Sequence, residues 1–394
     1  MSKLTLTHGS LSIAFSITLD YKEVGDKVAA EFAQTLTVID KQLSDMELLA
    51  MFIEYTSRTQ TYLAAAALGD FERRFCDSGS TNVHAAVLRH NLLDEQVHAV
   101  LRGYYSAWPQ NTDSMPCNSA FFSSEAIRPI MTFAGSVGSL ESGVKSLAEL
   151  RRLVDIYKPL VVDFVCQMSD FLHGESRDLR ITHCYPHGFV IAQWTGVASA
   201  QSGIDHNAIR DEYVNSSPVA APLGGLLQLV RLIVLHKTLN VPVEQVVKRL
   251  SAVAGHSHGI AIAAAASMAG SEEQLLASSR TALGTLMLAG CLPQIVCPQD
   301  PAKANVATND SGSDTVFETA SAIISVCGAP KHAVDGVLGM FNKFHKADNS
   351  AQMYVSMANG GDWFCVSGDR VWMTQLVKNI RAKSASDADG DQEG

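Results

Sequence analysis

Residues 251–268 read SAVAGHSHGIAIAAAASM and combine three local patterns in one order. A short apolar run leads into Gly255-His256-Ser257-His258-Gly259, and a segment rich in Ala and Ile follows. This order predicts a strand, a sharp turn and a helix. Glycines at both ends of a G-x-S-x-G turn let backbone approach backbone where a Cβ atom would clash. We therefore predict that Ser257 lies above the end of a parallel sheet, at the start of a helix.

A serine in this position has the properties of a nucleophile. Free N–H groups at a helix N-terminus stabilise negative charge that develops on an attacked carbonyl. By geometry, the backbone N–H of His258, the residue after the serine, is one such oxyanion donor. The alternative is that Gly255 and Gly259 only end a strand and begin a helix. The pentapeptide is short, so the flanking strand and helix carry the prediction.

Composition narrows the class of protein. With 394 residues, 47% of them hydrophobic and 18% charged, the chain can bury a sizeable core and form two or three structural units. A formal net charge of -10 and the lack of a basic cluster speak against nucleic acid and anionic membrane surfaces as partners.

Targeting signals and metal sites are not expected. The longest smooth apolar stretches, 224–235 and 260–269, are too short to span a bilayer. The N-terminus alternates like a strand and lacks the features of a secretion signal. Eight scattered cysteines without a C-x-x-C pair indicate reduced thiols and a cytoplasmic location. His183, Cys184 and His187 lack an evident fourth ligand, so we interpret them as loop residues rather than a zinc site.

The chain divides into four predicted parts. Residues 1–125 form an N-terminal strand plus a helical region, with helices at 27–38, 44–68, 83–92 and 95–108 and Asp94 as an N-cap. Residues 126–310 form an α/β core, with strand 129–134, helix 147–172, helix 222–240 and a helix capped at Ser271. Residues 316–383 read strand, helix, strand, strand, helix, which is a ferredoxin-like unit without its last strand. Residues 384–394 form a disordered acidic tail, and 109–118 a linker.

A small-residue loop follows the first strand of the α/β core. It reads Gly135-Ser136-Val137-Gly138-Ser139. Such a loop can present backbone N–H groups to an anion, but short loops use the same residues without a ligand. The candidate substrate-binding residues are Gly135, Ser136, His256 and Gly259.

Several segments together resemble one known family. The runs are LTLTHGSL at 4–11, APLGG at 221–225 followed by Leu227-Gln228-Leu229, AGHSHG at 254–259, Asn359-Gly360, and VSG at 366–368. They are similar to the N-terminal acyltransferase domain of the fungal type I fatty acid synthase β subunit. That domain has the fold of malonyl-CoA:ACP transacylases, an α/β fold with a parallel-sheet core and a nucleophile elbow.

The resemblance implies a starter acyltransferase. Ser257 would take an acyl group, typically acetyl, from coenzyme A and pass it to the phosphopantetheine thiol of an acyl carrier protein, in fatty acid or polyketide biosynthesis. Acyl-CoA and the carrier protein are then substrates, synthase subunits are further partners, and no bound cofactor or metal is expected. Malonyl-specific relatives place an arginine in the helix after the elbow helix. Arg280 is the only arginine there, and we expect it to face away from the pocket, which favours a neutral acyl group.

Two departures from the family pattern are visible. The family's first loop carries a G-Q-G, and this sequence has no glutamine there; losing one oxyanion contribution costs about 2.7–4 kcal/mol of transition-state stabilisation. The family's catalytic histidine follows the ferredoxin-like unit, beyond the last residue of this sequence. Of the histidines after Ser257, we expect none of His258, His332 and His345 to act as the base. The alternative function is therefore a catalytically impaired or truncated relative that binds a synthase.

Overall fold

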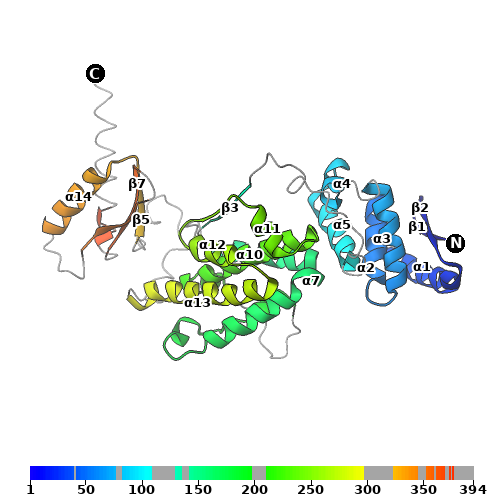
Figure 1. Cartoon of the computed structure of the whole chain (residues 1–394), viewed down its shortest axis with the longest axis horizontal. Coiled ribbons are helices and arrows are strands. Elements are labelled where there is room, and N and C mark those ends of the chain that lie inside the picture. Colours follow the sequence, from blue (N-terminus) through cyan, green and yellow to red (C-terminus); the bar gives the residue numbers. More distant parts are fainter. Residues whose placement is uncertain are drawn as a thin grey trace, which may run out of the picture. The chain divides into compact units, whose positions relative to one another are not determined.

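The computed structural model describes residues 1–39, 41–76, 82–108, 129–134, 142–197, 210–296, 323–344, 352–358, 361–368, 372–373 and 375–376 (Figure 1). Contacts divide the chain into two compact units, Met1–Pro293 and Gln294–Gly394. Both units combine helices with small sheets, which is consistent with an α/β acyltransferase-like domain. The predicted linker 109–118, the loop residues Gly135 and Ser136, Asn359-Gly360 and the tail 384–394 lie outside the described residues.

A β-hairpin opens the first unit. Strands β1 (Ser2–His8) and β2 (Leu11–Ile17) pair antiparallel, with Leu4 opposite Phe15 and Leu6 opposite Ile13. All four of these side chains are buried, because alternate residues of a strand share one face. The hairpin packs on α1 (Lys22–Leu36), α2 (Asp45–Thr56) and α3 (Thr61–Phe75). A 3-10 turn at Leu19–Tyr21 joins β2 to α1.

Polar side chains connect the helices of this region. Glu47 is 1% exposed, yet its carboxylate accepts hydrogen bonds from Ser44, Lys41 and the Gln96 amide. Gln96 lies on α5 (Asp94–Ala107), so the buried carboxylate connects α2 to α5. These three residues donate four hydrogen bonds to the carboxylate, which offset the cost of burying its charge.

Two predictions for this region are wrong in detail. The predicted helix 44–68 is two helices, α2 and α3, separated at 57–60. The N-cap of α5 (Asp94–Ala107) is Leu93, whose N–H donates to the Gln96 side chain, and Asp94 is the first helical residue. The remaining helix here is α4 (Val83–Arg89).

The α/β part contains a parallel strand pair that is largely exposed. Strand β3 (Ile130–Phe133) pairs with β4 (Ala252–Gly255), with Phe133 opposite Gly255. The helices around it are α7 (Ser142–Glu175), α8 (Ile191–Trp194), α9 (Asp211–Val214), α10 (Ser217–Thr238), α11 (Val243–Arg249), α12 (Gly259–Ser267) and α13 (Glu272–Val296), with a 3-10 turn at Thr182–Cys184.

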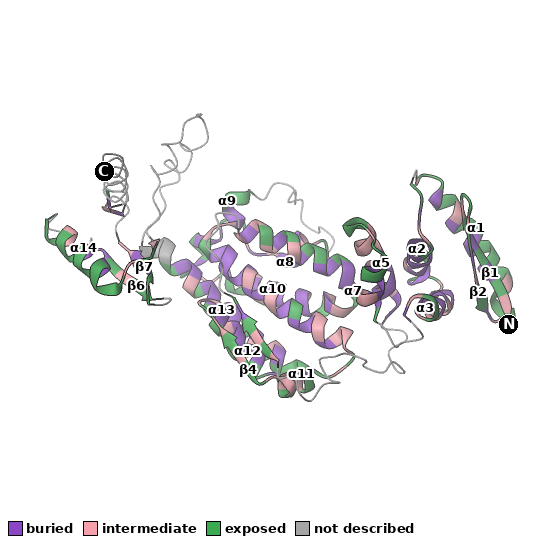
Figure 2. Ribbon diagram, turned by 90° about the horizontal axis from the view of Figure 1, so that it is seen from above, coloured by how far each residue is buried: buried purple, intermediate pink, exposed green. Residues whose placement is uncertain are grey.

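Two long helices organise these elements. Helix α10 packs against α7 and α12, and Figure 2 shows that most of its surface is buried. Helix α7 departs from helical geometry at Tyr157, two residues before Pro159, whose ring cannot supply a backbone N–H. The predicted cap of α13 is confirmed, because the Gln274 N–H donates to the Ser271 hydroxyl at 3.1 Å.

Helix length corrects one prediction about membranes. Among the described residues, two helices are long and apolar enough to cross a membrane by length and composition: α10, with 22 residues, and 272–292 of α13, with 21. The length of the apolar segment around 224–235 was therefore underestimated, because the stretch is part of the 22-residue helix α10. The most apolar window of α10 is 72% buried inside the protein, as in the core helix of a globular fold, so this is weak evidence for a membrane.

The second unit contains an antiparallel sheet and a helix. Strand β7 (Trp363–Ser367) lies between β5 (Ile323–Cys327) and β6 (Tyr354–Ala358), and α14 (Lys331–Phe344) joins β5 to β6. Phe364 and Val366 of β7 are buried together with Val334 and Leu338 of α14. Helix α14 is amphipathic, and its apolar side therefore covers one face of the sheet.

Candidate functional site

The predicted turn around Ser257 lies between β4 and α12. Ser257 has a φ of +53°, in the left-handed region. Among the described residues, the other non-glycine residues with positive φ are Asn91 and Asn240, and asparagine adopts this conformation far more readily than most residues. A serine held in this region stores backbone strain, which commonly marks a functional position.

Both glycines of the turn are required by close backbone contacts. A Cβ atom on Gly255 would lie 2.3 Å from the carbonyl oxygen of Gly259, and one on Gly259 would lie 2.1 Å from the carbonyl oxygen of Phe133. No carbon atom tolerates an oxygen at such distances. The two glycines therefore press the start of α12 against β4 and against the end of β3.

Backbone hydrogen bonds fix the turn in place. The His256 N–H donates to the Phe133 carbonyl at 3.0 Å, which extends the strand pairing by one residue. The Gly259 N–H donates to the His256 carbonyl at 2.9 Å, and the Ile260 N–H donates to the Ser257 carbonyl at 3.0 Å. Ser257 thus sits in a tight, fully tethered loop immediately before α12.

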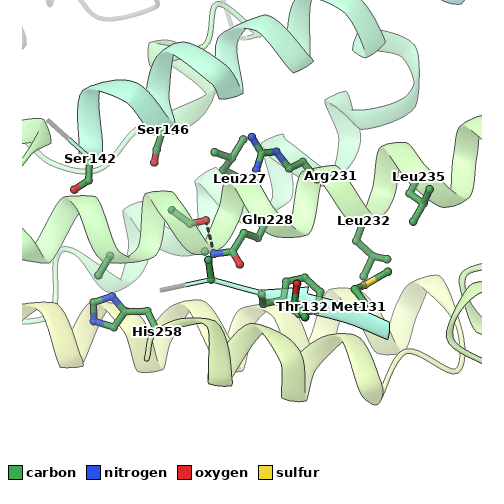
Figure 3. A pocket seen from close by; sticks show the side chains of 15 residues that line it. Met131, Thr132, Ser142, Ser146, Leu227, Gln228, Arg231, Leu232, Leu235 and His258 are labelled. Carbon is green, nitrogen blue, oxygen red and sulfur yellow. Dashed lines mark hydrogen bonds between the residues drawn. The ribbon is translucent and has the colours of Figure 1, made fainter. Parts of the chain in front are cut away.

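A pocket of about 470 Å³ adjoins this turn (Figure 3). Helix α10 lines it from Ala221 to Leu235, and the adjacent α7 contributes Ser142 and Ser146. The remaining lining residues are Met131, Thr132, Phe133, Ala134 and His258. Since four consecutive residues of the β3 segment line the pocket, it lies along the edge of that strand. Apolar side chains dominate, with a few polar groups among them.

The pocket reaches His258, the residue after the serine, whereas Ser257 itself is not among the lining residues. His258 is the N-cap residue of α12, and its half-buried ring lines the pocket. Burial lowers the pKa of the His258 imidazole below its usual value, so the neutral ring is favoured. The sequence argument assigned only the backbone N–H of His258; the side chain as a wall of the pocket was missed.

Comparison with protein families decides the family of this chain. Residues 143–389, more than half of the chain, match the family described as starter unit:ACP transacylase in aflatoxin biosynthesis. The chain belongs to this transacylase family. The proposed resemblance is thereby confirmed at the level of the family.

Individual relatives of this transacylase are fungal fatty acid synthase β subunits. The β subunit aflB of Emericella nidulans is 26% identical over 343 residues, which cover 79% of this chain and 15% of the relative. TOXC of Cochliobolus carbonum is 24% identical, covering 93% of this chain and 18% of the relative. The β subunit of Schizosaccharomyces pombe is 24% identical, covering 86% and 16%. The chain therefore spans less than a fifth of the length of these relatives.

The structure brings some of the predicted site residues together and does not describe others. Ser257, His258 and Gly259 come together at the start of α12, with Gly259 buried and Ser257 half-buried. His256 is exposed on the same turn. Gly135 and Ser136 lie outside the described residues, so their predicted role in substrate binding stays a prediction.

Sequence reasoning missed several residues of the pocket. Gly224, Gln228 and Arg231 follow one another at intervals of four and three on α10, so they share one face of that helix. The available signal was a small or polar residue at each of these positions within an otherwise apolar helix. Arg231 is directed toward Glu149 of α7, 3.5 Å away, and its side chain is 56% exposed.

Other candidate residues lie away from the pocket. Arg280 is exposed on α13 and is not among the residues that line the pocket. His183 and His187 are exposed, whereas Cys184 is buried, so these three side chains do not converge. In the part of the chain that the structure describes, no group of three or more His, Cys, Asp or Glu residues is arranged to hold a metal ion.

Proposed function

We propose that this chain is a starter acyltransferase that moves acetyl or another neutral acyl group from coenzyme A to an acyl carrier protein, through an acyl ester on Ser257. The observation that carries the proposal is the conformation of Ser257. It has a positive φ between a strand and a helix, in a turn whose two glycines admit no side chain. These features support a nucleophile elbow, a turn that exposes a hydroxyl at the top of a sheet.

The first half-reaction forms the acyl-enzyme. A general base takes the proton from the Ser257 hydroxyl, and Oγ attacks the thioester carbonyl carbon of acyl-CoA. The resulting oxyanion receives a hydrogen bond from the backbone N–H of His258 at the start of α12. The C–S bond then breaks, and the sulfur of coenzyme A leaves with the proton that the base returns.

The second half-reaction transfers the acyl group. The phosphopantetheine thiol of the carrier protein loses its proton to the base and attacks the ester carbonyl on Ser257. The C–O bond breaks, and the serine oxygen recovers the proton. Serine, a base and N–H donors suffice for these steps, so the proposed chemistry uses no bound cofactor or metal. In the family the base is a histidine beyond the ferredoxin-like unit.

The lining of the pocket supports a neutral acyl group. Leu227, Leu232 and Leu235 form much of the α10 wall. Arg231 lies within ion-pair distance of Glu149, and Arg280 is exposed elsewhere. A malonyl carboxylate in an apolar pocket needs an available cation, because a buried unpaired charge is strongly disfavoured.

The names of the relatives support the biological setting. They are fatty acid synthase β subunits, and the matching family is named for transfer of a starter unit to a carrier protein. We therefore place the chain in fungal fatty acid or polyketide biosynthesis, in the cytoplasm, with a carrier protein and synthase subunits as partners.

Covalent labelling tests the proposal. The purified chain is incubated with acetyl-CoA carrying a radiolabelled acetyl group, beside the Ser257→Ala variant and a Ser267→Ala control, whose hydroxyl lies at the far end of α12. We expect label in the wild type and in the control and none in Ser257→Ala. Equal label in all three proteins contradicts an acyl-serine mechanism. Binding of acyl-CoA without label in any of them favours the alternative, a binding role within a synthase.

A further inference from the structure

One polar side chain on the α10 wall of the pocket has an unused hydrogen-bonding group. The Gln228 amide nitrogen donates to the Gly224 carbonyl at 3.2 Å, one helical turn earlier. The amide oxygen of Gln228 is buried and has no hydrogen-bond partner among the described residues. A buried acceptor that lacks a donor is unfavourable, so such an atom requires an explanation.

The orientation of this amide is fixed by its own hydrogen bond. A backbone carbonyl only accepts, so the group that faces Gly224 must be the amide N–H₂ and not the oxygen. Exchanging the two atoms would set one oxygen against another. The oxygen is consequently held on the other side of the amide, away from the helix backbone.

The position of Gln228 relates this oxygen to the catalytic turn. Figure 3 shows Gln228 between His258, which follows the serine, and Leu232, further along the same pocket. The neighbouring lining residues on α10 are apolar or small except Arg231, whose guanidinium is directed toward Glu149. Among the α10 side chains that line the pocket, Gln228 is the one that carries a hydrogen-bond acceptor. This acceptor lies further along the pocket than His258, the residue after the serine.

A ligand that matches this wall needs an apolar chain interrupted by an N–H donor. The pantetheine arm has this chemistry: methylene groups alternate with two amides, and the first amide N–H lies two methylenes from the thioester sulfur. Coenzyme A and a phosphopantetheinylated carrier protein present the same arm. One acceptor on the protein can therefore serve both halves of a transacylation.

We propose that the Gln228 amide oxygen accepts a hydrogen bond from an amide N–H of the pantetheine arm and thereby positions the thioester at Ser257. This inference rests on the proposed acyltransferase function. Gln228 is a positioning residue: it holds the arm and does not touch the reacting carbonyl. The Gly224 carbonyl supports it by holding the amide in one orientation.

Binding of free pantetheine tests the inference without requiring turnover. The variant Gln228→Met keeps the length of the side chain and removes the acceptor. Gln193→Met is a matched control, because the Gln193 amide oxygen is likewise buried without a partner but lies on α8, outside the pocket lining. By calorimetric titration we expect Gln228→Met to weaken pantetheine binding about tenfold, since losing one hydrogen bond of ordinary strength has an effect of this size. Gln193→Met should bind like the wild type.

Kinetics with two thioesters separate positioning from a general structural effect. With S-acetylpantetheine, Gln228→Met should lower kcat/KM for acylation of Ser257 about tenfold. With ethyl thioacetate, which has no amide, the same variant should match the wild type within about twofold. An equal loss with both thioesters overturns the inference, as does unchanged pantetheine binding in Gln228→Met. If the wild type binds pantetheine in a Gln228-dependent manner but takes no acyl label, the inference stands and the proposed acyltransferase function fails.

Discussion

The first unit contains two small sheets that differ in almost every respect. The antiparallel pair β1–β2 joins seven residue pairs, and its inward side chains are at most 2% exposed. The parallel pair β3–β4 joins four residue pairs, and Ile130 at its start is 61% exposed. Parallel strands are normally covered on both faces, so the second pair is unusual. The hairpin therefore contributes stability, whereas β3–β4 holds one turn beside one pocket.

The largest expected effect concerns the turn. Ser257→Ala should abolish acylation, because no other residue in the proposed mechanism forms the acyl ester. Ser257→Gly should be equally inactive, yet its free energy of unfolding should stay within about 1 kcal/mol of the wild type, since glycine adopts positive φ without strain. Acyl transfer is followed by mass spectrometry, and stability by urea unfolding. If Ser257→Gly is unfolded as well as inactive, the residue is needed for folding, and the prediction that it serves the site rather than stability is wrong.

The next largest effect is the difference in stability lost when one side chain is truncated in each of the two sheets. Phe15 of β2 is 2% exposed and its ring lies 5.8 Å from that of Phe52. Phe15→Ala should therefore lower the free energy of unfolding by about 3–5 kcal/mol. Ile130→Ala on β3 should lower it by no more than about 0.5 kcal/mol. Chemical denaturation measures both, and comparable losses contradict the assignment of stability to the hairpin.

A smaller effect tests the close backbone approach at the turn. Gly259→Ala forces a Cβ atom against the Phe133 carbonyl, so we expect a loss of about 1–3 kcal/mol together with loss of acylation. Gly69→Ala is the control. Gly69 lies inside α3 with open space where its Cβ would be, and alanine there should stabilise the protein by about 0.5–1 kcal/mol. Thermal unfolding of both variants gives the comparison, and a stabilised Gly259→Ala would show that the turn has room to spare.

The smallest expected effect is on the pH dependence of stability, which we compare for one histidine of the N-terminal helices and one at the pocket. Burial lowers the pKa of His84, on α4, and that of His258, at the pocket. A histidine with a lowered pKa binds fewer protons in the folded than in the unfolded state. Its contribution to stability is therefore complete above a pH of about 6.5 and is lost as the pH falls below that value. His84→Gln should reduce the loss of unfolding free energy between pH 7 and pH 5.5.

His258→Gln should change this pH dependence less, because burial desolvates the His258 ring less completely than the His84 ring. Urea unfolding at both pH values measures the difference. If both substitutions change the pH dependence of the unfolding free energy equally, the His258 ring is as strongly desolvated as the His84 ring.

The strand–turn–helix at 251–268 was predictable because its signals are local. Glycine spacing, an apolar run and a helix-forming segment specify the order, and the observed β4 and α12 lie within the predicted limits. The same holds for β7, predicted at 363–367. The break between α2 and α3 was missed because the apolar residues on both sides of it keep helical spacing.

The pocket was not predictable in the same way. It depends on contacts between segments far apart in the sequence: Ser142 and Ser146 on α7, Gln228 on α10 and Met131 on β3. No local pattern states that these will meet. A glutamine in an apolar helix is equally compatible with a surface position, and only the packing of α10 between α7 and α12 decides otherwise.

The bend in α7 has a mechanical consequence. The first turns of this helix carry Ser142 and Ser146 at the pocket, and the helix also packs against α5 of the N-terminal region. Because Pro159 cannot donate to the carbonyl of Asp155, the helix is least stiff between its two halves. Helix α5 reaches α7 at Asp155 and Tyr157, on the same half as the two serines, so a bend at Pro159 redirects the second half of the helix and leaves this half in place.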